Sequence, residues 1–191
     1  MLRQIRMKLT AALAIAAGVQ IDALADKDTV VPGDSMGTTV SVFYPATSAL
    51  SVRDVSLKAP TGWQIAASET PKAPDQGFGR RETAKQAAAF KVTVPANERL
   101  TQPYWLEDPR QGELFSWPET DDQNLPFHPP LVVAQVKVDI DGNEITFEQP
   151  VKFRHADPAR GEIRRDIDLV PQLSVSVDQK LMIAAASDKP L

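Results

Sequence analysis

The sequence predicts a mainly β protein: an immunoglobulin-like antiparallel β-sandwich with an N-terminal helix and the start of a second β domain. Asp141-Gly142 lies between two runs of alternating apolar residues, which is a strong hairpin signal. Other short alternating runs are separated by turn residues, as in sandwiches. The chain has 16 prolines against 9 glycines, and prolines suit strand starts and sheet edges better than helix interiors.

The hairpin over residues 131–154 is the clearest element. With Asp141-Gly142 as a two-residue loop, Ile140 faces Asn143, because a type I′ turn needs positive φ at both central positions. Three apolar pairs then share one face: Val138 with Ile145, Val136 with Phe147, and Val132 with Val151. The opposite face carries Lys137, Asp139, Glu144, Thr146, Glu148 and Lys152. Such an alternation predicts a sheet with one wet side.

Further strands are predicted along the rest of the chain. Residues with period two lie at Thr38–Tyr44, Ser51–Lys58, Phe90–Pro95 and 161–170. The run Ala84–Ala89 has local helix propensity, and we expect it to lead into the strand that follows. A Pro-Thr-Gly turn precedes Trp63, which is expected to close one end of the sandwich.

Three segments make up the expected domain organisation. Residues 1–25 form a helix or signal peptide, residues 26–170 form the sandwich, and residues 171–191 are a linker and the opening strands of a truncated second β domain. The last assignment depends on the alternating runs at 173–177 and 181–183.

Residues 1–25 permit two interpretations. Basic residues precede an alanine-rich apolar run, and Ala23-Leu24-Ala25 resembles a cleavage site, so the segment fits a secretory signal peptide. The run is too short for a transmembrane helix. Alternatively, an ordinary helix would bury one stripe of residues, and Asp22 argues against the signal peptide. That stripe comprises Leu2, Ile5, Leu9, Leu13 and Ala16.

Composition excludes several classes of function. The net charge of −4 and the pI near 5.2 argue against a nucleic-acid-binding surface. The chain has no cysteine, so it forms neither disulfides nor thiolate metal sites. It has only two histidines, which limits any zinc chemistry.

A group of aromatic residues follows the predicted strand at 90–95. Tyr104, Trp105, Phe115 and Trp117 could form a platform on which sugar rings stack, and they are the candidate ligand-binding residues. Alternatively they cap the sandwich core, and the usual burial preferences of aromatic side chains favour this second interpretation. The acidic residues around them are expected to be solvated loop residues.

Metal and catalytic residues are not predicted. His155 with Asp157 is the nearest pair to a metal site, and His128 could join it if the fold brought them together. Zinc needs three or four convergent donors, so we expect no metal site and no cofactor. Asp139, Asp141 and Asn143 could suggest calcium, but turn chemistry explains them. No nucleophile motif or phosphate loop is present, so no catalytic residue is assigned.

Two groups of motifs resemble known families. The strand end Leu57-Lys58-Ala59-Pro60-Thr61-Gly62-Trp63, followed by Phe90-Lys91-Val92-Thr93-Val94-Pro95, resembles the NEW-type β-sandwich modules of secreted glycosidases. Gln102-Pro103-Tyr104-Trp105-Leu106, Phe127-His128-Pro129-Pro130 and the stretches 148–154 and 157–165 are similar to the region after the catalytic domain in bacterial PIG-L (LmbE-like) deacetylases. The resemblance covers most of residues 27–185.

The resemblance implies an accessory part of such a protein. The family removes acetyl groups from N-acetylglucosamine-type substrates with zinc, through a His-Pro-Asp-Asp run that this chain lacks. The chain is therefore expected to be a non-catalytic spacer, docking surface or weak glycan binder, located in the periplasm or outside the cell. Its expected partners are a preceding deacetylase domain and glycans. A preceding domain favours the interpretation of residues 1–25 as a genuine helix. The alternatives are a zinc-dependent de-N-acetylase acting through His128, His155 and Asp157, and a free-standing carbohydrate-binding module.

Overall fold

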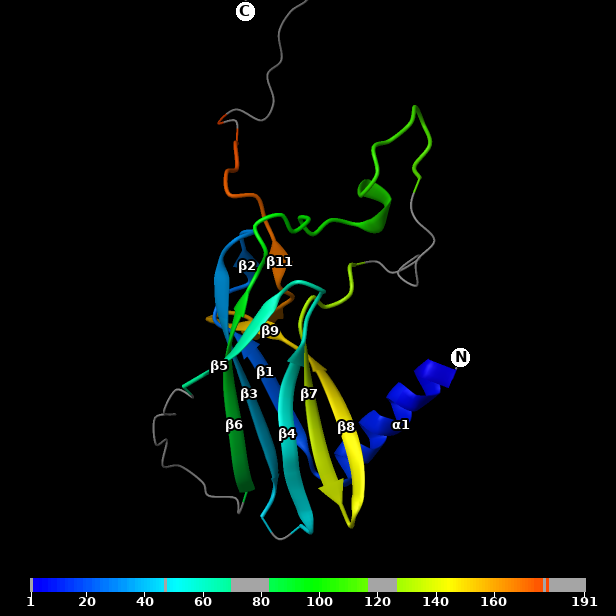
Figure 1. Cartoon of the computed structure of the whole chain (residues 1–191), viewed down its shortest axis with the longest axis vertical. Helices are drawn as coiled ribbons and strands as arrows, with labels where there is room; N and C mark the ends of the chain where they lie inside the picture. The colour runs from blue at the N-terminus through cyan, green and yellow to red at the C-terminus, as the bar shows by residue number, and fades with distance from the viewer. Residues whose placement is uncertain (1, 47, 70–82, 117–126, 177, 179–191) are drawn as a thin grey trace, which may run out of the picture.

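The computed structural model describes residues 2–46, 48–69, 83–116, 127–176 and 178. Strands dominate it, which confirms the predicted mainly β class (Figure 1). Its elements are α1 (Leu2–Ala16), β1 (Gln20–Ala25), β2 (Thr29–Val30), β3 (Ser35–Pro45), β4 (Leu50–Lys58), β5 (Gln64–Ser68), β6 (Thr83–Thr93), η1 (Tyr104–Leu106), β7 (Val133–Ile140), β8 (Asn143–Pro150), β9 (Lys152–Asp157), β10 (Gly161–Arg165) and β11 (Asp168–Leu169).

Two sheets face each other across one hydrophobic core. The larger sheet has the order β10-β9-β1-β3-β6-β5, and the smaller has the order β4-β7-β8. Alternate residues of β3 and β7 point inward, as the period of two requires. Val40 and Val42 of β3 and Val136 and Val138 of β7 are completely buried and belong to the same core cluster. Burial of these two faces is what holds the sandwich together.

The structure confirms the predicted hairpin. Val136 pairs with Phe147, Val138 with Ile145, and Ile140 with Asn143. Asp141 has φ 50° and Gly142 has φ 80°, the two positive values that a type I′ turn requires. The Asp139 carboxylate accepts the backbone N–H of Gly142, so turn chemistry accounts for the acidic residues here.

The second arm of the hairpin ends earlier than expected. β8 stops at Pro150, and from Lys152 the chain continues as β9 in the other sheet, where it pairs with β10 and β1. Val151 lies between the two strands; it is buried, and its N–H donates to the carbonyl of Val132. The chain thus crosses from one layer to the other within a single buried residue.

Helix α1 ends in a well-formed C-terminal cap. Gly18 has φ 68°, its N–H donates to the Ile15 carbonyl, and the N–H of Val19 donates to the Ala14 carbonyl. This is the Schellman pattern, in which glycine takes the left-handed conformation just after the helix. A Cβ on Gly18 would lie 3.0 Å from Pro45 Cγ, so close packing also favours glycine. The cap directs the chain into β1.

The sequence did not predict β1. Gln20–Ala25 pairs antiparallel with β3 and parallel with β9, and Ala23 and Ala25 are buried in the core. The expected boundary after Ala25 therefore falls at the end of a strand that belongs to the sandwich. Cleavage there would remove an interior strand of the larger sheet.

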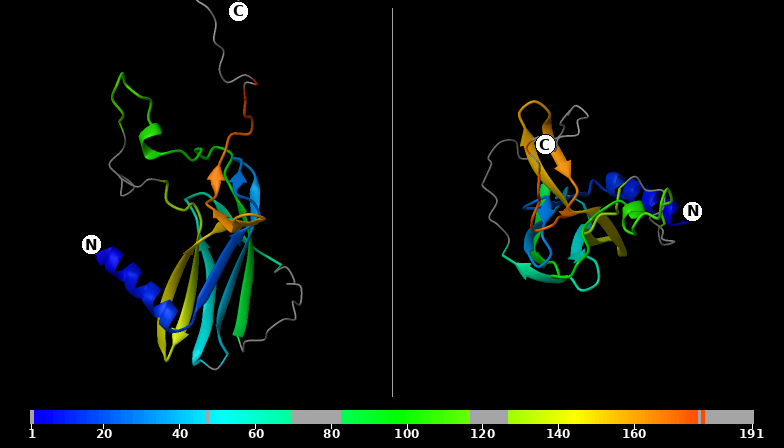
Figure 2. Two further views of the ribbon diagram at one scale, coloured as in Figure 1. Left: turned by 180° about the vertical axis from the view of Figure 1, so that it is seen from behind. Right: turned by 90° about the horizontal axis from the view of Figure 1, so that it is seen from above.

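The buried stripe expected on α1 is not found. Ile5, Leu9 and Leu13 are exposed by 53%, 68% and 37%, and Ala14 and Ala17 are the residues that pack against the core. The helix projects away from the sandwich beside β8 (Figure 2). Among the described residues, no helix has the length and apolar content to cross a membrane.

In the middle of the chain, two strands differ from those predicted from the sequence. β6 begins at Thr83, so the alanine run is itself strand and pairs with β3 along its whole length. Pairing to a neighbouring strand has overridden the local helix propensity of alanine. β5, which the sequence did not predict, is an exposed edge strand beside β6.

The last part of the chain differs from expectation in two ways. The predicted strand over 161–170 is split into β10 and β11, and β11 pairs in parallel with β2. Residues 173–176 form no strand, and Leu173 and Val175 are exposed by 84% and 95%. The other run assigned to the second β domain, 181–183, lies outside the described residues.

Trp63 closes one end of the sandwich, as expected. It is 8% exposed, belongs to the core cluster, and its Nε1–H donates to the Glu98 carboxylate at 2.7 Å. A buried tryptophan normally satisfies its N–H in this way.

We predict that Trp63→Ala lowers the free energy of unfolding by about 3–5 kcal/mol, because it leaves a large cavity. Trp63→Phe keeps most of the apolar contact but leaves Glu98 without its donor, and should cost about 1–2 kcal/mol. Chemical denaturation measures both. The matched control is Ile65→Ala on exposed β5, with an expected loss below about 1 kcal/mol. Equal losses for Trp63→Ala and Ile65→Ala would show that Trp63 does not close the core.

Candidate functional site

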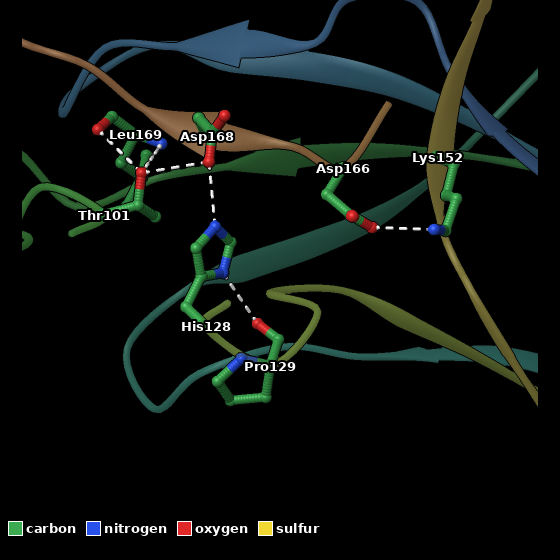
Figure 3. A network of polar contacts seen from close by, with 7 residues as sticks. All are labelled: Thr101, His128, Pro129, Lys152, Asp166, Asp168 and Leu169. Atoms are coloured by element: carbon green, nitrogen blue, oxygen red, sulfur yellow. Dashed lines mark hydrogen bonds and ion pairs between the residues drawn. The ribbon is translucent and has the colours of Figure 1, made fainter. Parts of the chain in front are cut away.

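A polar network lies at the end of the sandwich opposite the junction of α1 and β1 (Figures 1 and 3). It joins three segments that are distant in sequence: Thr101 after β6, His128 before β7, and Asp168 in β11. The Thr101 hydroxyl lies 3.3 Å from the Asp168 carboxylate and accepts the backbone N–H of Leu169. The backbone N–H of Thr101 donates to the Leu169 carbonyl. The network therefore attaches the loop after β6 to β11.

His128 is held at both ring nitrogens. Its Nδ1 lies 2.9 Å from the Pro129 carbonyl, and its Nε2 lies 2.8 Å from the Asp168 carboxylate (Figure 3). Both neighbours accept hydrogen bonds, so both nitrogens donate only when the ring is the imidazolium ion. This arrangement makes His128 a clamp between the segment before β7 and β11. In the imidazolium form neither ring nitrogen keeps a lone pair with which to bind a metal.

The charge balance around His128 supports the cationic ring. Partial burial opposes the charged form, but the hydrogen bonds to Pro129 and Asp168 outweigh it, and the pKa of His128 is raised above its ordinary value. Asp166 adds a weaker electrostatic contribution in the same direction and pairs with Lys152 at 3.1 Å.

A groove of about 420 Å³ lies beside this network. Its walls come from residues 100–103, from Phe127 and His128, and from residues 168–171. A much smaller hollow of about 20 Å³ adjoins it and is lined by Tyr104 and Trp105 of η1. Gln102, Pro103, Phe127 and His128 line both spaces, so the two lie side by side. We call them together the end groove.

The aromatic residues are not core caps, and that expectation is wrong for the three that are described. Tyr104 and Trp105 lie in η1, which has no buried residue, and Phe115 is 43% exposed. Trp117 lies outside the described residues. The rings of Tyr104 and Trp105 meet edge to face with centroids 5.0 Å apart, while Phe115 contacts the Arg110 guanidinium. Of these three described residues, Tyr104 and Trp105 border the end groove and Phe115 does not.

The candidate metal residues are not brought together. Asp157 accepts the backbone N–H groups of Ala159 and Arg160, which makes it a turn cap between β9 and β10. His155 stacks on Phe153 at 5.8 Å. Within the described residues, no three His, Cys, Asp or Glu side chains are arranged to hold a metal ion. His128 belongs to the separate network at β11.

The sequence pointed to His128 as a possible metal ligand but did not pair it with Thr101 or Asp168. These partners lie 27 residues before and 40 residues after it, so no local pattern joins them. The available signal was a histidine between a phenylalanine and two prolines, which fixes the backbone without revealing its partner.

We predict that His128 makes stability depend on pH. A group whose pKa is raised by folding stabilises the protein fully below its unfolded pKa, ordinarily near 6.5, and this stabilisation is lost as the pH rises through the folded pKa. The stability of the wild type relative to His128→Gln should therefore fall between mildly acidic and alkaline pH. For a partly exposed pair the effect should be about 1 kcal/mol or less.

Chemical denaturation across this pH range tests the prediction, with His155→Gln as a control that removes the other histidine. If the difference in free energy of unfolding between the wild type and His128→Gln were the same at every pH, the charged clamp would be contradicted.

Comparisons with protein-family models, with curated proteins and with solved structures found no match to this chain.

Proposed function

We propose that this chain is a non-catalytic β-sandwich accessory domain of a PIG-L (LmbE-like) deacetylase-like protein, and that it docks onto the catalytic domain through α1. The motif resemblance supports the family, and the outward apolar face of α1 supports the docking role. The catalytic domain lies on the same chain or on another. The periplasmic or extracellular location implied by the resemblance stays a prediction.

The packing of α1 is the observation that carries the docking role. Ile5, Leu9 and Leu13 recur every four residues and so lie along one face of the helix. The small side chains Ala14 and Ala17 pack toward the sandwich, which leaves the large ones in solvent. A contiguous apolar face of this kind is typical of an interaction surface.

The charges on α1 narrow the kind of partner. The helix carries Arg3, Arg6 and Lys8, and the first acidic residue in the chain is Asp22. In a parallel pair, two copies of this helix would bring their basic ends together, and the repulsion disfavours that mode of self-association. A partner with an apolar groove and an acidic rim is complementary to it.

The alternative of a zinc-dependent deacetylase receives no support from the described geometry. It requires His128, His155 and Asp157 to converge, whereas both nitrogens of His128 are engaged and Asp157 caps a turn. We therefore propose the accessory role for this chain and assign no catalytic residue.

We predict that a PIG-L-type catalytic domain from the same genome forms a complex with the full chain, and that Leu9→Glu abolishes it. The substitution places a charge in the centre of the apolar face. Ala11→Glu is the matched control, because it adds the same charge on an exposed position of the same helix. Size-exclusion chromatography with light scattering gives the readout.

The wild type and Ala11→Glu should elute as a complex, and Leu9→Glu as free protein with an unchanged thermal midpoint. The docking role would be overturned if the wild type formed no complex with an excess of the catalytic domain. It would also be overturned if Leu9→Glu bound the catalytic domain as well as the wild type does.

A further inference from the structure

Three aromatic side chains line the end groove: Tyr104, Trp105 and Phe127. Phe127 is 78% exposed, and it lines both the main cavity and the hollow beside η1. Trp105 and Tyr104 extend the aromatic surface from the hollow. Phe127 is exposed and Tyr104 and Trp105 are half-buried, so a ligand that covered these rings would remove apolar surface from water.

The polar groups of the groove fall into two sets. Thr101, His128 and Asp168 bond to one another, so they form a pre-organised wall. Gln102 and Glu107 lie at the rim and are exposed, so their amide and carboxylate can make hydrogen bonds to a ligand. The site thus combines flat apolar surfaces with hydrogen-bonding groups at the edge.

The charges disfavour an anionic ligand. Among the described residues that line the end groove, Asp168 pairs with His128 at 2.8 Å, and Glu107 is the charged side chain without an ion pair. A phosphate or uronate would meet a carboxylate without a compensating cation. A neutral ligand with many hydroxyl groups would not.

We propose that the end groove binds a neutral pyranose saccharide. One face of a sugar ring packs on Phe127, and the next sugar unit of the saccharide packs on Trp105. The hydroxyl groups of the sugar form hydrogen bonds with Gln102 and Glu107. A volume of about 420 Å³ suits one or two sugar rings. An apolar peptide would also cover the aromatic rings, but its side chains carry no donor for Gln102 or Glu107 at the rim, whereas each sugar ring carries several hydroxyl groups.

His128 acts here as a positioning residue. Its clamp onto Asp168 and onto the Pro129 carbonyl fixes the backbone next to Phe127, so the aromatic wall is held in place before the ligand arrives. Pre-organisation of this kind lowers the entropy lost on binding.

This inference goes beyond the docking role and rests on a different surface. Loss of docking in Leu9→Glu should leave saccharide binding unchanged, so either proposal can fail alone.

Isothermal titration calorimetry of the full chain tests the proposal with cellohexaose, xylohexaose, chitohexaose and a soluble β-1,3-glucan, and with oligogalacturonate as the anionic probe. We expect at least one neutral saccharide to bind. We expect Phe127→Ala and Trp105→Ala each to weaken that binding roughly tenfold or more, as loss of an aromatic contact implies. Leu114→Ala is the control, because Leu114 is 74% exposed in the same loop but does not line the groove.

Thermal midpoints of the variants show whether each is folded. A chemical-shift titration of the wild type provides a second measurement that needs no variant, and should move the signals of residues 101–105 and 127–128. Absence of binding by all the neutral saccharides at millimolar concentration would overturn the proposal. Equal binding by Phe127→Ala, or preference for oligogalacturonate, would also overturn it.

Discussion

The insertion of β1 between β3 and β9 is the constraint on which the rest of the structure depends. β3, β6 and β5 form one part of the larger sheet and β9 and β10 another, and among the described strands only β1 joins them. Asp22 in β1 reinforces this position, since it pairs with Arg154 of β9 at 3.1 Å and with Arg164 of β10 at 2.9 Å. Three adjacent strands are thereby connected through one carboxylate that is largely shielded from water. The same strand fixes where α1 leaves the sandwich.

The crossing at Val151 makes the two layers interdependent. β8 is the last strand of the smaller sheet and β9 pairs with β1 in the larger one, so one buried residue ties the end of one layer to the other. Two apolar surfaces of this scaffold do not pack into its core. One is the apolar face of α1, and the other is the end groove beside β11. We attribute binding functions to these two surfaces because the core itself is made of valines and other apolar residues with no reactive group.

The sequence predicted those parts of the fold that local patterns determine. The Asp-Gly turn and the strict alternation around Val136 and Phe147 fixed the hairpin register, because a slip of one residue would turn the apolar face to solvent. β1 was missed because its small apolar residues follow a basic and alanine-rich segment, which also fits a signal peptide. Asp22, which weakened that interpretation, is now explained by its two arginine partners. The predicted strand began at Phe90, whereas β6 begins at Thr83, because alanine favours helix locally. Pairing along β3 makes the alanine run a strand.

The candidate site was harder to predict for the same reason. The sequence singled out the aromatic residues at 104 and 105 as candidates, but typical burial preferences place such residues in the core, and only the three-dimensional structure shows that they border a groove. The clamp of His128 depends on partners far away in sequence, which a single chain does not reveal without its fold.

The role of β1 is tested most directly by comparing two truncated chains with the full chain in a denaturation experiment. One lacks residues 2–16 and retains β1, and the other lacks residues 2–25 and loses it. The account predicts cooperative unfolding near the midpoint of the full chain for the first, and loss of cooperative unfolding for the second. A chain lacking residues 2–25 that unfolded cooperatively at the same midpoint as the full chain would contradict it.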